Sequence, residues 1–313
     1  MQNFKTKYDA DLHCHTVRSD GNDTPEELIA KAANLNMAAI AIVDHDISPS
    51  QPLILKKLAK KLKMDLIFGY EFSCDTFVDD VHIIGYELDW NNQLVKQEEE
   101  RAKQSKSDAY KKLCRILAKK GIFIDFESEI LTYKDLSGKI CHRNPDEVQK
   151  KHIFELMAQK GYFDSWEKAK LFIKYNPELN IKREKINPLL AINIIKGAGG
   201  LAVLAHPFLI DEKIQSKDLK CKNRKTYIDK LIKAGLDGIE SCYTYNKTSY
   251  KGNLTNNQIK EIIETEYKNK VKFFTGGSDY HNDEKKGAKN PRFIGEAGIS
   301  YKQFKTIFSN YLI

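Results

Sequence analysis

Residues 24–46 read TPEELIAKAANLNMAAIAIVDHD, and this stretch decides the fold class. Thr24 caps a predicted helix, because Pro25 suits the first helical turn and Glu27 stands where it closes a capping box. The apolar run at 37–43 is typical of a strand that is buried on both faces of a parallel sheet. A helix followed at once by such a strand predicts a β-α-β rhythm.

Similar apolar runs recur along the chain, and the later ones each follow a segment with helical spacing. Such alternation predicts an α/β fold in which helices pack around a parallel sheet, closed as a barrel or open and doubly wound. The further strands are expected at 65–70, 81–86, 200–205, 238–241 and 271–275.

The middle of the chain departs from this rhythm. From 94 to 185 the apolar residues follow helical spacing almost throughout. We expect this segment to be a helical insertion that caps the active site, because insertions in barrels lie over the carboxyl ends of the strands. The barrel itself would consist of residues 1–93 and 186–313.

The composition is that of a globular protein. The chain has 313 residues, of which 41% are hydrophobic, so it can bury a large core. Its six cysteines lack C-x-x-C spacing, which argues against a disulfide framework and fits a reducing cytoplasm. No apolar run reaches the roughly 18 residues of a membrane span. We therefore expect a cytoplasmic protein without a membrane partner, and the sequence leaves the oligomeric state open.

The net charge of +8 comes from 51 basic and 43 acidic side chains. This excess favours an anionic substrate, although a lysine-rich proteome would give the same balance. Basic and aromatic residues do not interleave as they do where successive bases stack, so neither long-duplex DNA binding nor processive tracking is expected. Tyr243, Tyr245 and Tyr250 would suit stacking of a single base, or would be half-buried loop residues.

Side chains that can bind metal ions occur at most of the expected strand ends. His13 and His15 end the first strand and point to the same face, because side chains alternate along a strand. The carboxyl ends of parallel strands converge, so the groups there should meet. Six imidazoles and three carboxylates suit zinc, manganese or ferrous iron better than calcium or magnesium. The candidate ligands are His13, His15, Asp20, His45, Glu71, His82, His206, Asp279 and His281.

A single strand histidine is more often structural than metal-binding, and it is the succession of these residues at strand ends that favours a metal site. Asp44 and Asp46 flank His45. We interpret them as groups that orient its imidazole, or as helix caps.

At these positions the sequence resembles the PHP family, named for polymerase and histidinol phosphatase domains. The resemblance implies a distorted (β/α)7 TIM-like barrel with a helical insertion and a site for three divalent ions, manganese first, with zinc or ferrous iron as alternatives. The similar stretches, in the family's order, are DLHCHT (11–16), SDG (19–21), VDHD (43–46), GYEFS (69–73), HIIG (82–85), LAHP (204–207) and GSDYH (277–281).

The resemblance also implies how the ligands divide among the ions. One ion would be held by His13, His15, Glu71 and Asp279, a second by Glu71, His82 and His206, and a third by Asp20, His45 and His281.

Within the family, Asp20 and the insertion resemble the branch that removes the 3′-phosphate from 3′,5′-bisphosphonucleotides and trims short RNA from its 5′ end. The segment VQKKHI (148–153) is similar to that branch's insertion motif, with Lys150 where arginine is usual. Lysine keeps the charge but loses bidentate contact with phosphate. The resemblance implies that Lys150, His152 and Arg183 bind the substrate; otherwise they are solvated helix charges.

The sequence thus predicts a metal-dependent phosphoesterase that hydrolyses bisphosphonucleotides or the 5′ end of short RNA with a metal-activated hydroxide. No G-x-S-x-G elbow or P-loop offers another route, and no catalytic residue beyond the metal ligands is needed. The proton for the leaving oxygen would come from a metal-bound water or from His152. Two alternatives stay open: a small-metabolite monophosphatase like histidinol phosphatase, and a regulatory domain that binds metal without catalysis.

Overall fold

The structure, a computed structural model, describes residues 6–134, 138–217 and 219–312. These residues divide into two compact units. Residues up to 99 and from 186 onward form what we name the barrel unit, and residues 100–185 form the insertion unit.

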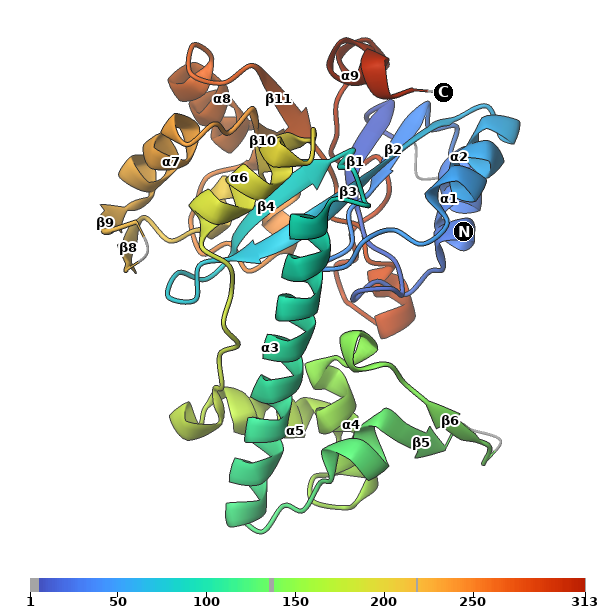
Figure 1. Ribbon diagram of the computed structural model, residues 1–313, viewed down its shortest axis with the longest axis vertical. Coiled ribbons are helices and arrows are strands. Elements are labelled where there is room, and N and C mark those ends of the chain that lie inside the picture. Colours follow the sequence, from blue (N-terminus) through green and yellow to red (C-terminus); the bar gives the residue numbers. More distant parts are fainter. Residues whose placement is uncertain (1–5, 135–137, 218, 313) are drawn as a thin grey trace. The chain divides into compact units, whose positions relative to one another are not determined.

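A seven-stranded sheet forms the centre of the barrel unit (Figure 1), in the order β1-β2-β3-β4-β7-β10-β11. β1 pairs with β2, β2 with β3, β7 with β10, and β10 with β11, all in parallel. The strands are β1 (Ala10–Cys14), β2 (Ala39–Ile42), β3 (Asp65–Cys74), β4 (Val81–Tyr86), β7 (Leu201–Leu204), β10 (Gly238–Cys242) and β11 (Phe273–Gly276), with a small β8 (Lys213–Ser216) and β9 (Cys221–Asn223) hairpin beside them.

The sheet nearly closes on itself where β1 meets the segment that follows β11. Cys14 and Tyr280 form a parallel bridge, in which the His15 amide donates to the Tyr280 carbonyl at 2.9 Å and the Tyr280 amide to the His13 carbonyl at 3.1 Å. Gly277 permits this approach, because a Cβ there would lie 2.2 Å from the Cβ of His13. The predicted distorted barrel is thereby confirmed.

One expectation about the sheet is wrong. β4 runs antiparallel to both β3 and β7, not parallel. The connection from 75 to 80 is too short for the crossover that a parallel strand requires. As part of this hairpin, β3 continues to Cys74, so Glu71 lies within the strand and not at its end.

Helices pack on the outside of the sheet, and the first is capped as predicted. The Glu27 amide donates to Thr24 Oγ1 at 3.2 Å, and the Thr24 amide to the Glu27 carboxylate at 2.8 Å. α2 contacts β3, α6 contacts β4 and β7, and α8 contacts β10 (Figure 1). The helices of the barrel unit are α1 (Pro25–Asn34), α2 (Pro52–Lys61), α6 (Pro188–Gly197), α7 (Arg224–Lys233), α8 (Asn256–Tyr267), α9 (Tyr301–Phe308) and the short η4 (Pro207–Leu209), η5 (Tyr245–Lys247), η6 (Asp283–Lys286) and η7 (Ser309–Tyr311).

The insertion unit has its own apolar core. The long helix α3 (Gln93–Lys119) enters it, and Leu113 and Leu117 pack there with Ile153 and Met157. Its other elements are η1 (Phe126–Leu131), β5 (Thr132–Lys134), β6 (Ile140–His142), η2 (Pro145–Glu147), α4 (Lys150–Gln159), α5 (Trp166–Lys174) and η3 (Pro177–Leu179).

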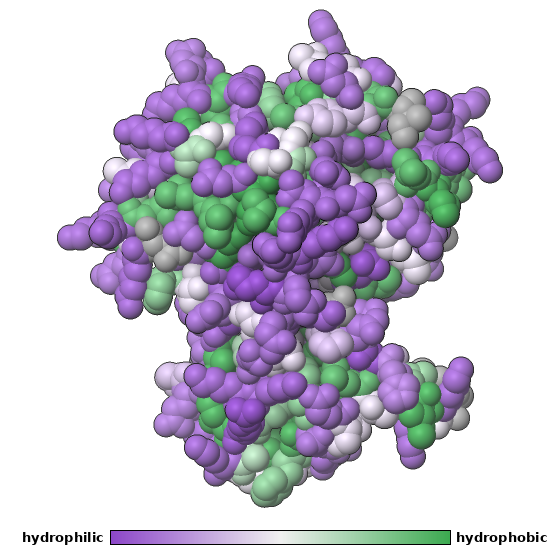
Figure 2. All heavy atoms as spheres, in the orientation of Figure 1, coloured by the Kyte–Doolittle hydropathy of each residue, from purple (hydrophilic) through white to green (hydrophobic). Residues whose placement is uncertain are grey.

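The surface is mainly polar. Figure 2 shows hydrophilic side chains over much of each unit, interrupted by hydrophobic patches. Leu53 and Ile54 of α2 and Leu190 of α6 are among the exposed apolar side chains. Within the described ranges, none of the helices combines the length and the apolar character needed to cross a membrane.

Candidate metal centre

The barrel brings all nine predicted ligands into one connected cluster. His13 lies in β1, Glu71 in β3 and His82 in β4, and the other six follow the ends of β1, β2, β7 and β11. Three groups of these side chains have donor atoms close enough to hold an ion. They are His15, Asp20, His45 and His281; His13, His15 and Glu71; and His45, Glu71 and His82.

Glu71 occupies the centre of the cluster and is completely buried. Its Oε2 lies 3.1 Å from His15 Nε2 and 3.3 Å from His13 Nε2. Its Oε1 lies 3.0 Å from His82 Nδ1 and 3.3 Å from His206 Nε2. The two carboxylate oxygens therefore face different sets of imidazoles, which is the arrangement that a carboxylate shared between two ions requires.

Asp279 and Asp20 approach the cluster from two other sides. Asp279 Oδ1 lies 3.2 Å from His15 Nε2 and 3.4 Å from His13 Nε2. Asp20 Oδ1 lies 3.0 Å from His281 Nε2 and 4.0 Å from His45 Nε2. Each carboxylate oxygen is thus shared between two imidazoles, as oxygen and nitrogen ligands of one ion are.

Some of the nitrogen atoms in the cluster lack hydrogen-bond partners within the described part of the chain, which favours a bound metal ion. Nδ1 of His45 and Nδ1 of His206 are buried and have no hydrogen-bond partner among the described residues. His45 Nδ1 lies 3.1 Å from Glu71 Oε2, but without the geometry of a hydrogen bond. A buried nitrogen without a partner is costly, and a divalent cation beside Glu71 would satisfy Nδ1 of His45. His206 faces Glu71 with its other nitrogen, Nε2, so a cation there leaves Nδ1 of His206 without a partner in the described ranges.

The electrostatics of the cluster also favour cations. Burial alone would lower the pKa of His15, but the carboxylates of Asp279 and Glu71 raise it to about 10. Burial would raise the pKa of Glu71, but the imidazoles of His45, His13 and His82 hold it well below the usual range. For His82, burial dominates and lowers the pKa to about 3, which keeps the imidazole neutral, as a metal ligand must be.

Two ligands adopt a backbone conformation that is unusual for residues other than glycine. His206 has φ of 30° and Asp279 has φ of 54°. Conformations of this kind cost on the order of 1 kcal/mol or more and cluster at functional sites. Here they turn two side chains into the cluster just after their strands end.

A buried carboxylate missing from the predicted set supports two of the imidazoles. Glu240 Oε1 lies 3.1 Å from His13 Nδ1, and its Oε2 accepts the His206 amide at 2.9 Å. Glu240 lies in β10. An acidic residue inside the expected strand 238–241 was the same signal that identified Glu71 and the other ligands, so the sequence could have revealed it.

The two aspartates beside His45 accept hydrogen bonds from neighbouring loops and strands. Asp44 accepts hydrogen bonds from the Thr16 amide at 2.8 Å and from Ser19 Oγ at 2.6 Å, so it fixes the loop after β1. Asp46 Oδ1 accepts the Ser73 amide at 2.9 Å. They shape the loops that carry the ligands.

Asp279 accepts hydrogen bonds from two side chains whose contact with it the sequence did not predict. Tyr243 donates its hydroxyl to Asp279 Oδ2 at 2.6 Å, and Arg292 donates a guanidinium N–H to the same oxygen. Arg292 also pairs with Asp283 at 2.8 Å. Arg292 belongs to an irregular loop. A loop has no periodic pattern from which buried side chains could be predicted.

Two of the three tyrosines after β10 differ from both expectations. Tyr243 and Tyr245 are each 1% exposed, so neither can stack a base, nor are they half-buried. Tyr250 is half-buried, as expected for a loop residue, and lines a cavity.

The predicted substrate-binding residues lie in the insertion unit. Lys150 and His152 are in the first turn of α4, and Arg183 is in the segment after η3. The Gln149 amide donates to His152 Nδ1 at 3.1 Å, so Nε2 of a neutral His152 carries the proton. Burial, with Arg143, Lys151 and Lys106, lowers the pKa of His152 to about 3, and burial also lowers the pKa of Lys150.

Comparison with known proteins agrees with this fold. The PHP domain family matches residues 11–163 of the chain. A protein from Bifidobacterium adolescentis, described as a metal-dependent phosphoesterase, superposes with a TM-score of 0.71 at 22% identity, covering 98% of this chain and 97% of that one.

Two curated relatives have named activities. The 5′-3′ exoribonuclease Rnm of Salmonella typhimurium is 28% identical over 211 residues, which cover 63% of this chain and 64% of the relative. The 3′,5′-nucleoside bisphosphate phosphatase of Chromobacterium violaceum is 25% identical over 200 residues, covering 63% and 66%. The matched region thus spans slightly less than two thirds of each relative's length.

Proposed function

We propose that this protein is a metal-dependent phosphoesterase that hydrolyses the phosphate of 3′,5′-bisphosphonucleotides and the 5′ end of short RNA. The observation that carries the proposal is the cluster of six imidazoles and three carboxylates around Glu71. The names of the exoribonuclease and bisphosphate phosphatase relatives support the substrate class.

We assign three divalent ions to the cluster, manganese first. His13, His15, Glu71 and Asp279 would hold one, Glu71, His82 and His206 a second, and Asp20, His45 and His281 a third. The mixed nitrogen and oxygen donors support manganese, zinc or iron. Such ions lower the pKa of water and offset the negative charge of a phosphate ester.

The surrounding residues hold the ligands in position. If Glu240 accepts the Nδ1 proton of His13, the Nε2 lone pair of that imidazole faces the cluster. Arg292 and Tyr243 engage Asp279 Oδ2, which leaves Oδ1 toward His13 and His15. Positioning by fixed hydrogen bonds keeps the donor atoms convergent when no ion is bound.

The space beside the cluster suits a phosphate. A cavity of about 300 Å³ is lined by His45, His82 and His206 together with Lys247 and Arg292. Lys247 pairs with Glu296, and Arg292 pairs with Asp279 and Asp283. The positive charge that attracts a phosphate would therefore come mainly from the bound ions, and the N–H groups of the two basic side chains would add hydrogen bonds.

Lys150, His152 and Arg183 are proposed to contact the second phosphate of the substrate. The tautomer and the low pKa of His152 support a role as a neutral hydrogen-bond donor through Nε2, not as the acid that protonates the leaving oxygen. A neutral imidazole is a poor proton source at pH 7. Protonation of the leaving oxygen is then left to solvent.

The test is an activity panel on protein stripped of metal and reloaded with manganese. Adenosine 3′,5′-bisphosphate, a 5′-phosphorylated RNA pentamer and histidinol phosphate are each incubated with it. Phosphate release from the first or shortening of the second supports the proposal. Turnover of histidinol phosphate alone would favour the monophosphatase alternative, and bound metal without turnover would favour the regulatory one.

The variant that tests the assignment of the metal ligands is His13→Ala. We expect its rate to fall by about a thousandfold or more, because a metal site fails without one of its direct ligands. Its metal content, measured on the same sample, should fall too. Normal turnover with unchanged metal content would remove the site assignment.

A further inference from the structure

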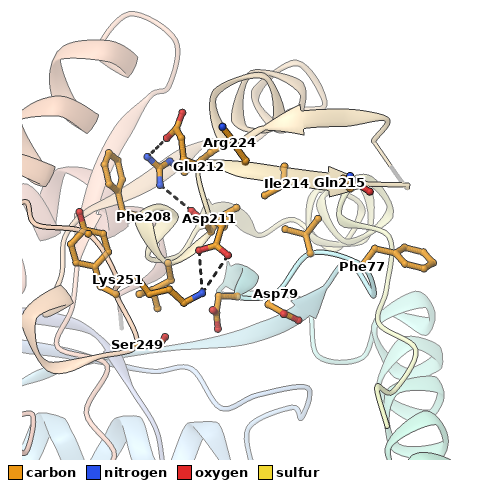
Figure 3. A pocket seen from close by; sticks show the side chains of 17 residues that line it. Phe77, Asp79, Phe208, Asp211, Glu212, Ile214, Gln215, Arg224, Ser249 and Lys251 are labelled. Carbon is orange, nitrogen blue, oxygen red and sulfur yellow. Dashed lines mark hydrogen bonds and ion pairs between the residues drawn. The ribbon is translucent and has the colours of Figure 1, made fainter. Parts of the chain in front are cut away.

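A second and larger cavity adjoins the one at the metal cluster. It has a volume of about 580 Å³ and lies entirely within the barrel unit (Figure 3). Asp80, Leu209 and Ser249 line both cavities. These three residues form the border that a molecule bound at the cluster would have to cross to reach the larger cavity.

An exposed ion pair crosses the larger cavity. Figure 3 shows Lys251 reaching Asp211, with Nζ 3.4 Å from Oδ1. Their side chains are 78% and 63% exposed. Exposed pairs of this kind contribute roughly 0–1 kcal/mol, so an incoming ligand can separate the two groups at little cost. The pair would then offer one ammonium and one carboxylate to the ligand.

Planar groups form another wall. The guanidinium of Arg224 lies 3.9 Å from the centre of the Phe208 ring and is held by the Ile210 carbonyl at 2.9 Å. Tyr250 packs edge-on against the buried Tyr245, with ring centres 5.5 Å apart. Fixed guanidinium and aromatic planes are surfaces on which nucleobases stack.

Acidic residues limit what the cavity can bind. Asp79, Asp80 and Asp211 line it together with the basic Lys213 and Lys251. This mixture disfavours a group of several phosphates, but carboxylates accept hydrogen bonds from sugar hydroxyls and from the amino groups of bases. A ribonucleoside carrying one backbone phosphate matches the planes, the acids and the ammonium together.

We propose that this cavity binds the ribonucleoside that follows the scissile phosphate in an RNA substrate. The proposal rests on the function proposed above and extends it to the chain beyond the reacting phosphate. In a bisphosphonucleotide and in RNA alike, water adds to phosphorus, the P–O3′ bond breaks and a proton passes to O3′. The two substrates differ only in whether a further nucleoside is esterified to that phosphate, so the cavity matters for RNA alone.

The test compares two substrates on manganese-loaded protein: adenosine 3′,5′-bisphosphate and 5′-phosphorylated diadenylate. In Lys251→Glu, kcat/KM for the dinucleotide should fall about tenfold or more, the scale of one lost charged contact. The bisphosphate should stay within about twofold, as expected for an exposed side chain outside its site. Lys57→Glu on the exposed face of α2 makes the same charge change and should alter neither.

A second measurement uses the wild type and a dinucleotide whose second sugar is 2′-deoxy. Because the acids of the cavity would hydrogen-bond the 2′-hydroxyl, we expect this dinucleotide to be cleaved more slowly than the all-ribose dinucleotide, while equal rates would contradict the ribose assignment.

Equal loss of kcat/KM on the bisphosphate and the dinucleotide in Lys251→Glu, or no loss on either, would overturn the proposal. The proposal would also be overturned if the wild-type protein cleaved the bisphosphate but not the dinucleotide. That result would leave the proposed phosphatase activity intact. Failure on both would instead overturn the proposed function, and this inference with it.

Discussion

Glu240 Oε1 lies 3.1 Å from His13 Nδ1, and both side chains are completely shielded from solvent. The same carboxylate accepts the His206 amide, so one acid in β10 positions a ligand in β1 and a ligand after β7. A carboxylate behind a histidine fixes its tautomer and raises its basicity as a ligand. Glu240 therefore positions metal ligands without being a ligand itself.

Glu240→Gln should weaken metal binding by about 10- to 100-fold, the range seen when a carboxylate behind a ligating histidine is lost. The amide keeps the shape but removes the charge. Competition with a fluorescent chelator measures the affinity. Asp237→Asn, which removes another buried carboxylate that binds Lys196 and the Ala202 amide, should change the stability but leave metal affinity as it was. Wild-type affinity in Glu240→Gln would contradict the role.

Arg292→Ala should destabilise the metal-free protein more than the metal-loaded one. Arg292 is 15% exposed and compensates the buried charges of Asp279 and Asp283. Removing one member of such a group costs about 3–5 kcal/mol, and a bound cation beside Asp279 would restore part of that free energy. Urea unfolding with and without manganese gives the two values. Equal destabilisation in both states would argue against a cation at Asp279.

His152 should titrate far below the usual histidine range. Its pKa of about 3 lies below the unfolded value, so the stability it contributes is complete above about pH 6.5 and declines as the pH falls toward 3. The imidazole resonances, followed by NMR from pH 7 to pH 4, should stay those of the neutral Nε2–H form. A midpoint near 6.5 would instead allow His152 to act as an acid.

Gly277→Ala should damage the barrel closure. The added methyl would lie 2.5 Å from the His13 backbone nitrogen as well as 2.2 Å from its Cβ, and backbone cannot move aside cheaply. Overpacking of this kind costs about 1–3 kcal/mol or more, and the displacement would shift a metal ligand. Thermal unfolding and metal content should both drop.

Gly197→Ala in α6 is the matched control for this substitution. Nothing lies within 4 Å of its added methyl. Alanine is the better helix former by up to about 1 kcal/mol, so the stability should stay the same or rise. Similar losses in both variants would mean that the close contact at His13 is not the cause.

Local patterns predicted an α/β fold but left a closed barrel and an open sheet as alternatives, and the resemblance to the PHP family implied the barrel. The nine residues that the structure brings together could be predicted because each lies in or near an expected strand. His13, His45 and Asp279 stand next to apolar runs whose ends are visible in the sequence. The direction of β4 was missed because it depends on how short the 75–80 connection is, not on the strand itself. Arg292 was missed because a loop has no period, and its contact with Asp279 depends on how the irregular chain after β11 folds back.

Anomalous diffraction from manganese-soaked crystals would show directly whether the cluster around Glu71 is a metal centre. We expect anomalous peaks within coordinating distance of both oxygens of Glu71, one toward His13 and His15 and another toward His82 and His206. A third peak is expected between Asp20 and His281. Crystals that bind manganese elsewhere, with no peak at Glu71, would contradict the metal centre.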